Sequence, residues 1–383
     1  MPHALHSVPP PSAKPPSIRP IPARLEIDER VTGRGVTIGF LDSGFFAHAD
    51  LVEPESRILA HHDVLTDETT LRGTPPPNAS SWHGMMTSVV CAGNGHLSGG
   101  KYRGLAPDAL VVLVKVGSIQ RIQHHAIRDG IRWAIAHREQ YGIRVLNISC
   151  GGDYEESYLT DSLSRAAEDA VRAGIVVVAA VGNSGRHGSR VLPPASAPSV
   201  ISVGGFDDTS NQNSHSMYHS SHGPTVDGLQ KPELIAQAIW VAAPVLPETP
   251  TARHVELLHA LANADGDDAV RELLRDGAGI DPELDAIAGG EAYLIRSLVE
   301  LKYRDQKIVS GHYKHVDGTS FAAPIVSAVV AQMLEANPAL TPPQVKKILI
   351  DTALRIPGVE VDRQGWGVVQ PARAVARALQ ARL

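Results

Sequence analysis

The sequence contains only two cysteines, Cys91 and Cys150, among its 383 residues. Two thiols cannot build the disulfide framework of a small secreted domain, and two alone do not complete a tetrahedral zinc site. We interpret both cysteines as reduced, which favours a cytoplasmic protein.

Long apolar segments are also missing. No stretch approaches the roughly 20 apolar residues that cross a membrane. The first residues, Met1 to Pro11, lack the basic start and the apolar run of about 7–15 residues that a signal peptide needs. We therefore expect a soluble, cytoplasmic protein with no membrane partner.

An excess of positive charge is absent as well. The net charge is −6, from 41 acidic and 35 basic residues, which argues against a nucleic-acid partner. The acidic excess is local, because residues 245–309 hold 13 acidic and 7 basic residues while the rest of the chain holds 28 of each. One acidic segment in a neutral body suggests an insertion.

The N-terminal part of the chain is rich in proline. Eight of the 28 prolines lie within the first 22 residues, so this part should be extended. The sequence therefore predicts a Pro-rich extension at residues 1–24 and a main domain at residues 25–383.

Four short apolar runs lack polar alternation and are typical of strands buried on both faces of a parallel sheet. Amphipathic helical segments lie between these runs, at residues 121–140 and 159–171. The alternation predicts an α/β domain of three layers, a mostly parallel central sheet with helices on both faces. The four runs are Val36–Leu41, Leu110–Val116, Arg144–Ser149 and Ile175–Ala180.

The strand–helix alternation stops at Pro244. Three helical stretches follow, at residues 253–263, 267–276 and 283–304, and a strongly apolar helix then begins after Ser320. We interpret residues 245–309 as a helical acidic insertion. It would serve as a lid, as a docking surface for a protein partner, or only as a solvated embellishment of the body.

A functional interpretation of three residues becomes stronger when they are considered together: Asp42, His83 and Ser320. Alone, Asp42 is an ordinary turn former after a strand, and the other two are ordinary residues at helix starts. Together they supply a hydroxyl, a base for its proton and a carboxylate that orients the base. Parallel strands end at one edge of their sheet, which would bring the three residues together.

Two further features suit the stabilisation of an oxyanion. Ser320 stands at a helix N-terminus, where backbone N–H groups and the positive end of the dipole are available. Asn183 lies in a Gly-flanked turn after a buried strand. Its amide either stabilises that turn or donates to the same oxyanion.

With these motifs the sequence resembles the subtilisin-like serine proteases, or subtilases. The resemblance covers residues from about Val36 to Pro244 and from Gly311 to the C-terminus. It is carried by five motifs in order: Leu41-Asp-Ser-Gly44, His83-Gly84, Asn147-Ile-Ser-Cys-Gly-Gly152, Val181-Gly-Asn-Ser-Gly185 and Gly318-Thr-Ser-Phe-Ala-Ala-Pro324.

The resemblance implies a subtilisin-like fold and a serine endopeptidase that acts on peptide or protein substrates. Ser320 would be the nucleophile, His83 the general base and Asp42 the residue that orients it. Asn183 and the Ser320 backbone N–H would bind the oxyanion. No cofactor would be required for this chemistry. The substrate backbone would pair with Ser149, Cys150, Gly151 and Gly152.

The sequence departs from the family pattern at several places. Met85 and Met86 follow the His-Gly motif, which alters the packing beneath the histidine. Cys150 replaces a larger aliphatic residue at the pocket rim and is either a small hydrophobic residue or a redox-sensitive thiol. The loop Gly117–Gln120 is short, so the recognition of extended substrates would be weaker or supplied by the insertion.

Two further expectations concern the N-terminal extension and a metal. Residues 17–24 either lie across the cleft, as extensions do in intracellular members of the family, or form a disordered tail. Asp50 resembles a residue that helps to bind structural calcium in many relatives, although the partner loop Gly93–Lys101 differs from theirs. The alternative for Asp50 is an ordinary loop-end aspartate.

Two other functions compete with hydrolysis. The same acyl-enzyme could pass its acyl group to an amine, which would make the protein a peptide ligase or cyclase. The fold could also serve as a latent, non-catalytic scaffold that binds a partner. The intact set of Asp42, His83 and Ser320 favours the endopeptidase.

Overall fold

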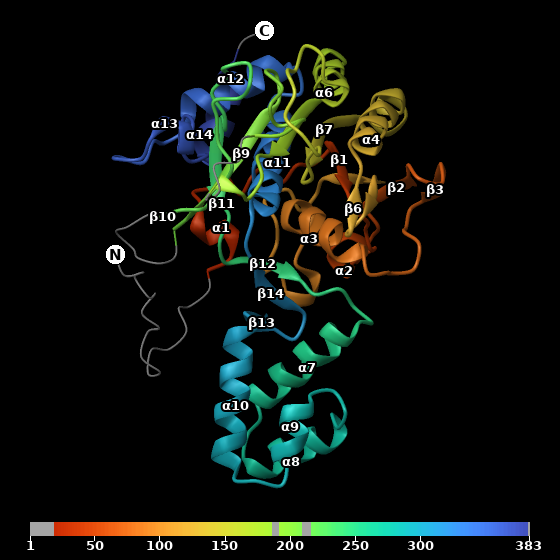
Figure 1. The fold of residues 1–383 in the computed structure, drawn as a ribbon, viewed down its shortest axis with the longest axis vertical. Coiled ribbons are helices and arrows are strands. Elements are labelled where there is room, and N and C mark those ends of the chain that lie inside the picture. The colour runs from red at the N-terminus through yellow and green to blue at the C-terminus, as the bar shows by residue number, and fades with distance from the viewer. Residues whose placement is uncertain (1–18, 186–190, 209–215, 382–383) are drawn as a thin grey trace.

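The computed structural model describes residues 19–185, 191–208 and 216–381. Its main feature is a nine-stranded sheet with the order β10-β9-β8-β7-β1-β4-β2-β3, in which β11 also pairs with β9 (Figure 1). All pairings are parallel except β2 with β3 and β9 with β10, at the two ends of the sheet. The strands are β1 (Thr37–Asp42), β2 (Ile58–Asp63), β3 (Glu68–Leu71), β4 (Leu110–Lys115), β7 (Ile143–Ile148), β8 (Val176–Ala180), β9 (Ile201–Asp207), β10 (Ser216–Met217) and β11 (Leu234–Gln237).

The four strands predicted from the sequence are the adjacent central strands β8, β7, β1 and β4. Their side chains are buried on both faces, as continuous apolar runs require. The sequence prediction did not include the outer strands, because β2 carries His61 and His62 and β3 is exposed along its length.

Helices cover both faces of the sheet, so the predicted three-layer α/β architecture is confirmed. One apolar core lies between the sheet and α4 and α6, and a second lies between the sheet and α3, α11, α12 and α14. The helices of the body are α1 (Ile21–Arg24), α2 (Ala49–Val52), α3 (Ser81–Ala92), η1 (His96–Ser98), α4 (His124–Ala136), α5 (Arg138–Tyr141), α6 (Ser162–Arg172), α11 (Thr319–Ala336), α12 (Pro342–Thr352), α13 (Val361–Gln364) and α14 (Pro371–Gln380). A two-stranded hairpin joins β5 (Gly117–Ser118) to β6 (Arg121–Ile122).

The central helix of the second core is α11. By length and composition it could cross a membrane, but 83% of its 18 residues are buried inside the fold. Such burial is what the core helix of a globular domain shows, since it is apolar on all sides. Helix α11 therefore connects the site at its N-terminus to the centre of the body.

The insertion forms a helical unit with an apolar core of its own, and it projects from the body in Figure 1. The chain enters it from β12 (Val241–Pro244) and returns through β13 (Ile308–Ser310) and β14 (Tyr313–Val316), which form a separate three-stranded sheet. Strand β14 leads directly into α11. The helices are α7 (Pro250–Ala262), α8 (Asp267–Asp276), α9 (Pro282–Ile287) and α10 (Ala292–Asp305).

One predicted helix of the insertion is wrong. Residues 283–304 form two helices rather than one, because the chain turns at Gly289 and Gly290 between α9 and α10. The Gly290 N–H closes this turn by donating to the carbonyl oxygen of Ile287 at 2.8 Å. Two consecutive glycines make a continuous helix costly and a turn easy.

The end of the N-terminal extension belongs to the body. Ile21 is buried in the second core, and the Arg24 guanidinium bonds to Asp208 and to the carbonyl oxygens of Ile239 and Trp240 at 3.0 and 2.9 Å. None of these contacts involves the candidate catalytic residues. The expectation that the extension crosses the cleft is therefore wrong for residues 19–24, and its remainder lies outside the described residues.

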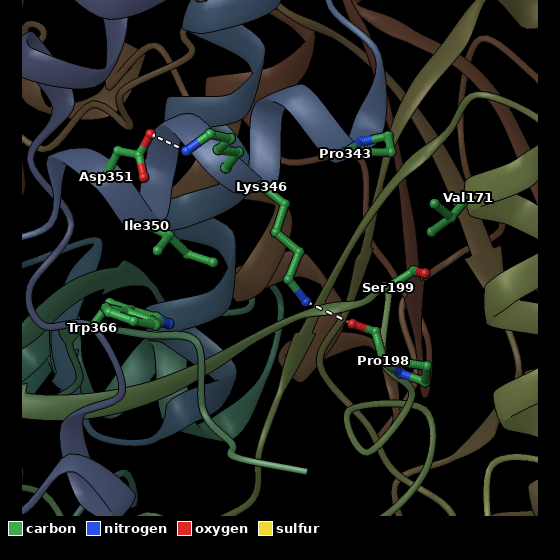
Figure 2. A pocket seen from close by; sticks show the side chains of 9 residues that line it. Val171, Pro198, Ser199, Pro343, Lys346, Ile350, Asp351 and Trp366 are labelled. Carbon is green, nitrogen blue, oxygen red and sulfur yellow. Dashed lines mark hydrogen bonds and ion pairs between the residues drawn. The ribbon is translucent and has the colours of Figure 1, made fainter.

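A buried charge cluster joins α12 to the sheet on the side away from the insertion. The Glu233 carboxylate accepts hydrogen bonds from Lys231 Nζ at 2.7 Å, from Lys346 Nζ at 2.6 Å and from the Ser202 backbone N–H at 2.8 Å. Figure 2 shows Lys346 reaching from α12 to the carbonyl oxygen of Pro198, along a cavity of about 660 Å³. Burial would raise the pKa of Glu233, but the two ammonium groups outweigh it and lower that pKa.

We expect Glu233→Gln to lower the free energy of unfolding by about 3–5 kcal/mol, because the buried ammonium group of Lys231 and the partly buried one of Lys346 would lose their counter-charge. Urea unfolding at neutral pH measures this loss. The matched control is Asp351→Asn, which breaks the exposed Lys347–Asp351 pair on the same helix and should cost only about 0.3–0.5 kcal/mol.

The pH dependence of this difference follows from the lowered pKa of Glu233. The carboxylate contributes stability above its unfolded pKa, and that contribution is lost as the pH falls through its folded pKa. The gap between wild type and Glu233→Gln should therefore narrow on acidification. Equal stabilities at neutral pH would contradict the role of the cluster.

Candidate active site

The Asp42 carboxylate is fixed at the end of β1. It is 1% exposed, and its Oδ1 accepts a hydrogen bond from the Ser43 backbone N–H at 2.7 Å. Thr87, one helical turn beyond His83 on α3, donates to Oδ2 at 3.2 Å. The side chain is therefore held in a single orientation toward α3.

His83 lies in the first turn of α3 and faces this carboxylate. Its Nδ1 is 2.7 Å from Asp42 Oδ1, so Nδ1 carries the proton and Nε2 of the neutral ring is the basic nitrogen. Burial lowers the pKa of His83, but the charge of Asp42 and its hydrogen bond outweigh burial, so the pKa is raised. His83 is therefore a stronger base than an ordinary imidazole.

Ser320 occupies the first turn of α11, as predicted. Its hydroxyl donates to the carbonyl oxygen of Ser149 at 3.3 Å, and its own carbonyl oxygen accepts from Ser149 Oγ at 3.0 Å. Pro324 explains the second bond, because proline has no N–H to donate to the carbonyl four residues earlier. The end of strand β7 and helix α11 are thereby joined at Ser320.

His83 and Ser320 are neighbours without a hydrogen bond between them in the described part of the chain. The His83 ring is 5.9 Å, centroid to centroid, from Phe321, the residue that follows Ser320. Catalytic hydrogen bonds are often long or misaligned before substrate binds. The Ser320 hydroxyl would have to turn from the Ser149 carbonyl toward His83 Nε2.

Asn183 lies in the turn after β8 and is oriented by Thr319. The Asn183 side-chain oxygen accepts hydrogen bonds from the Thr319 backbone N–H and from its hydroxyl, both at 2.9 Å. This arrangement leaves the Asn183 amide N–H groups as donors. A Cβ atom at Gly318 would lie 3.6 Å from Asn183 Nδ2, so the amide lies beside the N-terminus of α11.

The predicted substrate-binding segment forms one wall of a cavity of about 310 Å³ that Ser320 and Asn183 also line. The segment comprises Ser149, Cys150, Gly151 and Gly152. Gly152 donates its N–H to the carbonyl oxygen of Pro193 at 2.7 Å. An added Cβ atom at Gly152 would lie only 2.4 Å from His124 Nδ1, so no larger residue fits there.

His124 and Asp161 support this wall and were not identified from the sequence. His124 Nε2 lies 2.6 Å from Asp161 Oδ1, and the imidazole stacks on Tyr154 with ring centroids 4.7 Å apart. From the sequence, His124 and Asp161 can be recognised only as residues at the starts of two separate helices. No pattern indicates that they form a pair behind the cavity.

Cys150 packs at the edge of the first apolar core, with Sγ 3.8 Å from the carbonyl oxygen of Leu41. Burial, together with the nearby charge of Asp42, raises the pKa of its thiol. The thiol therefore stays protonated at neutral pH. This environment favours the interpretation of Cys150 as a small hydrophobic residue.

The contacts of Asp50 test its suitability as a calcium ligand. Its Oδ2 accepts a hydrogen bond from the Tyr313 hydroxyl at 2.6 Å, and its Oδ1 accepts one from the Leu97 N–H at 3.2 Å. Among the described residues, no three His, Cys, Asp or Glu side chains gather in a group that could hold a metal ion. Both carboxylate oxygens of Asp50 thus already accept hydrogen bonds from the protein. Calcium binding at Asp50 stays a prediction, and we derive no step through a metal.

A model of the subtilase family matches residues 33–367 of the chain. The serine protease AprX of Bacillus subtilis is 30% identical over 331 residues, which are 84% of this chain and 62% of AprX. Subtilisin DY of Bacillus licheniformis is 32% identical over 188 residues, 48% of this chain and 61% of the relative. The chain thus spans about three fifths of the length of these relatives.

Solved structures share the fold. The Clostridium perfringens CspB protease superimposes with a TM-score of 0.68 at 14% identity, over 93% of this chain and 97% of that one. Fervidolysin from Fervidobacterium pennivorans superimposes with a TM-score of 0.63 at 23% identity, over 93% of this chain and 44% of that one.

We expect Cys150 to react slowly with iodoacetamide at neutral pH, because only the thiolate is nucleophilic and burial raises the pKa of the thiol. Mass spectrometry after tryptic digestion measures alkylation of each cysteine separately. Cys91, buried in the second core, is the internal control. Both thiols should react readily in urea, whereas rapid alkylation of native Cys150 would restore the redox-sensitive interpretation.

Proposed function

Because the chain belongs to the subtilase family, we propose that it is a serine endopeptidase that hydrolyses peptide bonds in peptide or protein substrates, with Ser320, His83 and Asp42 as its catalytic triad. The hydrogen bond of 2.7 Å between His83 and the buried Asp42 is the observation that carries the proposal. Unlike the His124–Asp161 pair, this pair lies beside the helix-start Ser320, which is the arrangement of a base and its orienting carboxylate next to a serine nucleophile.

In the acylation step, Ser320 Oγ attacks the carbonyl carbon of the scissile bond while His83 Nε2 removes the hydroxyl proton. Asp42 stabilises the imidazolium that forms and keeps it oriented. The tetrahedral intermediate collapses when its C–N bond breaks, and the imidazolium returns the proton to the leaving amine. An ester between the acyl group and Ser320 remains.

The negative charge on the carbonyl oxygen would be stabilised by two groups. These are the Asn183 amide, fixed by its bonds to Thr319, and the Ser320 backbone N–H in the first turn of α11. Both donors are oriented before the substrate binds, so little reorganisation is needed as charge develops.

The acyl side of the substrate would lie along residues 149–152 and place one side chain in the cavity of about 310 Å³. Main-chain pairing of this kind gives affinity without selecting a sequence. Water then attacks the acyl-enzyme, with His83 again as the base, and releases the second product. Ser320 recovers its proton in this step.

We expect a fluorophosphonate probe to label Ser320 in the full chain, and Ser320→Ala to abolish labelling. The labelling rate should fall as the pH drops through the pKa of His83, because only the neutral imidazole accepts the serine proton. Since that pKa is raised, the acid limb should lie above that of an ordinary imidazole. In Asp42→Asn the limb should shift to lower pH and the rate should fall.

A chain that begins at Arg19 tests for inhibition by the residues before it, and it keeps the contacts of Ile21 and Arg24 with the body. Labelling of this shorter chain alone would assign an inhibitory role to the removed residues. If neither folded chain were labelled, the endopeptidase proposal would fail and the latent scaffold would replace it.

We expect Asn183→Ala to lower kcat by about 10²–10³ with little change in KM, the range established for removing this donor in subtilisin. Thr319→Val should lower kcat by only about 5- to 10-fold, since it removes one hydrogen bond that orients the amide. Steady-state kinetics on a chromogenic peptide amide measure both. A rise in KM as large as the expected loss in kcat would mean that Asn183 binds the ground state of the substrate instead.

A further inference from the structure

A second cavity, of about 780 Å³, lies between the segment ahead of His83 and the chain that enters the insertion. We call it the Lys314 groove. Trp82 and Met86 line it from α3, Leu246 and Glu248 from the entry to the insertion, and Lys314 and Val316 from β14. It shares no lining residue with the cavity beside residues 149–152.

The Lys314 groove is continuous with the proposed catalytic residues. Trp82 directly precedes His83, and the two rings meet edge to face with centroids 5.2 Å apart. Val316 lies at the end of β14, four residues before Ser320. With the acyl side of the substrate along residues 149–152, this separate groove beside His83 is available to the leaving-group side.

Strand β14 divides its side chains between two environments. Tyr313 and His315 are buried, whereas Lys314 and Val316 alternate with them and line the groove. Lys314 is half-buried, and in the described part of the chain its ammonium has no hydrogen-bond or ion-pair partner. By contrast, the nearby Lys307 pairs with Asp317 and lies over the Trp240 ring.

We propose that the Lys314 groove binds the leaving-group side of the substrate and that Lys314 selects an acidic side chain there. This inference rests on the proposed endopeptidase function and names its substrate class. A half-buried ammonium without a partner has lost part of its hydration. A substrate carboxylate would replace that hydration with a charge-assisted hydrogen bond. An acidic side chain at this position would therefore be preferred over a neutral or basic one.

Two other groups bear on the charge of the groove. Glu248 lines its outer edge, but its side chain is exposed, so water and salt screen its charge. Lys307 directly precedes β13, the strand next to β14. Burial lowers the pKa of Lys314, and the charge of Lys307 lowers it further. A carboxylate bound at Lys314 would offset both unfavourable contributions, which a basic side chain would increase.

The test uses internally quenched peptides with a fixed acyl side and Glu, Gln or Lys at each of the first four positions after the scissile bond. At one of these positions kcat/KM for Glu should exceed that for Gln by about 10–100-fold, as expected for a hydrogen bond to a charged group. The preference should weaken as ionic strength rises.

Variants assign the preference to Lys314. Lys314→Gln should bring the Glu-to-Gln ratio close to 1, Lys314→Arg should retain it, and Lys314→Glu should favour the Lys peptide. Lys347→Gln, at an exposed lysine on α12, is the matched control and should leave the ratio unchanged. A p-nitroanilide with the same acyl side has no residue for the groove, so every variant should cleave it equally.

The two proposals fail in different ways. If wild type cleaves neither the p-nitroanilide nor any peptide, the endopeptidase function fails. If it cleaves the p-nitroanilide but the Glu-to-Gln ratio is near 1 at all four positions, the role of Lys314 is overturned. A ratio that survives in Lys314→Gln while the p-nitroanilide is cleaved normally also overturns it.

Discussion

The hydrogen bond between Asp42 and His83 depends on the packing of the sheet against α3, and the rest of the site is arranged around it. The Asp42 carboxylate is buried and has no bulk water to solvate its charge, so it needs donors at fixed positions. Ser43, His83 and Thr87 supply them from the end of β1 and from two turns of α3. Any shift of α3 along the sheet would leave a buried charge unpaired, which gives the site its rigidity.

A second set of contacts joins α11 to the same edge of the sheet. Pro324 leaves the carbonyl oxygen of Ser320 without its helical partner, and Ser149 fills that place from the end of β7. Thr319 forms the matching connection to Asn183 at the end of β8. Ser320, His83 and Asn183 come from distant parts of the sequence and are thus held near one another by contacts at the ends of β8, β7 and β1, which are adjacent in the sheet.

The central sheet was predictable from the sequence, and the candidate site residues could be proposed from it, because their signals are local. The four central strands are continuous apolar runs, and the resemblance rests on short motifs around Asp42, His83, Asn183 and Ser320. The supporting pairs were not predictable. His124 and Asp161 are 37 positions apart, and Tyr313 and Asp50 are 263 apart, so only the fold brings them together. The break between α9 and α10 was missed because the periodicity of apolar residues outweighed Gly289 and Gly290 in the prediction.

Strand β14 connects the insertion to the site. Its buried side carries Tyr313, whose hydroxyl bonds to the buried Asp50 and fixes the strand to the body. Its other side carries Lys314 and Val316 in the groove, and its end leads into α11, whose first turn contains Ser320. Because Tyr313 fixes β14 to the body, the strand can hold the charge of Lys314 at a constant distance from Ser320. The insertion enters this arrangement through Leu246 and Glu248, which complete the groove wall. Helices α8, α9 and α10, which contribute no residue to the groove wall and pack on the insertion's own core, can therefore vary in sequence while the position of the groove beside His83 is kept.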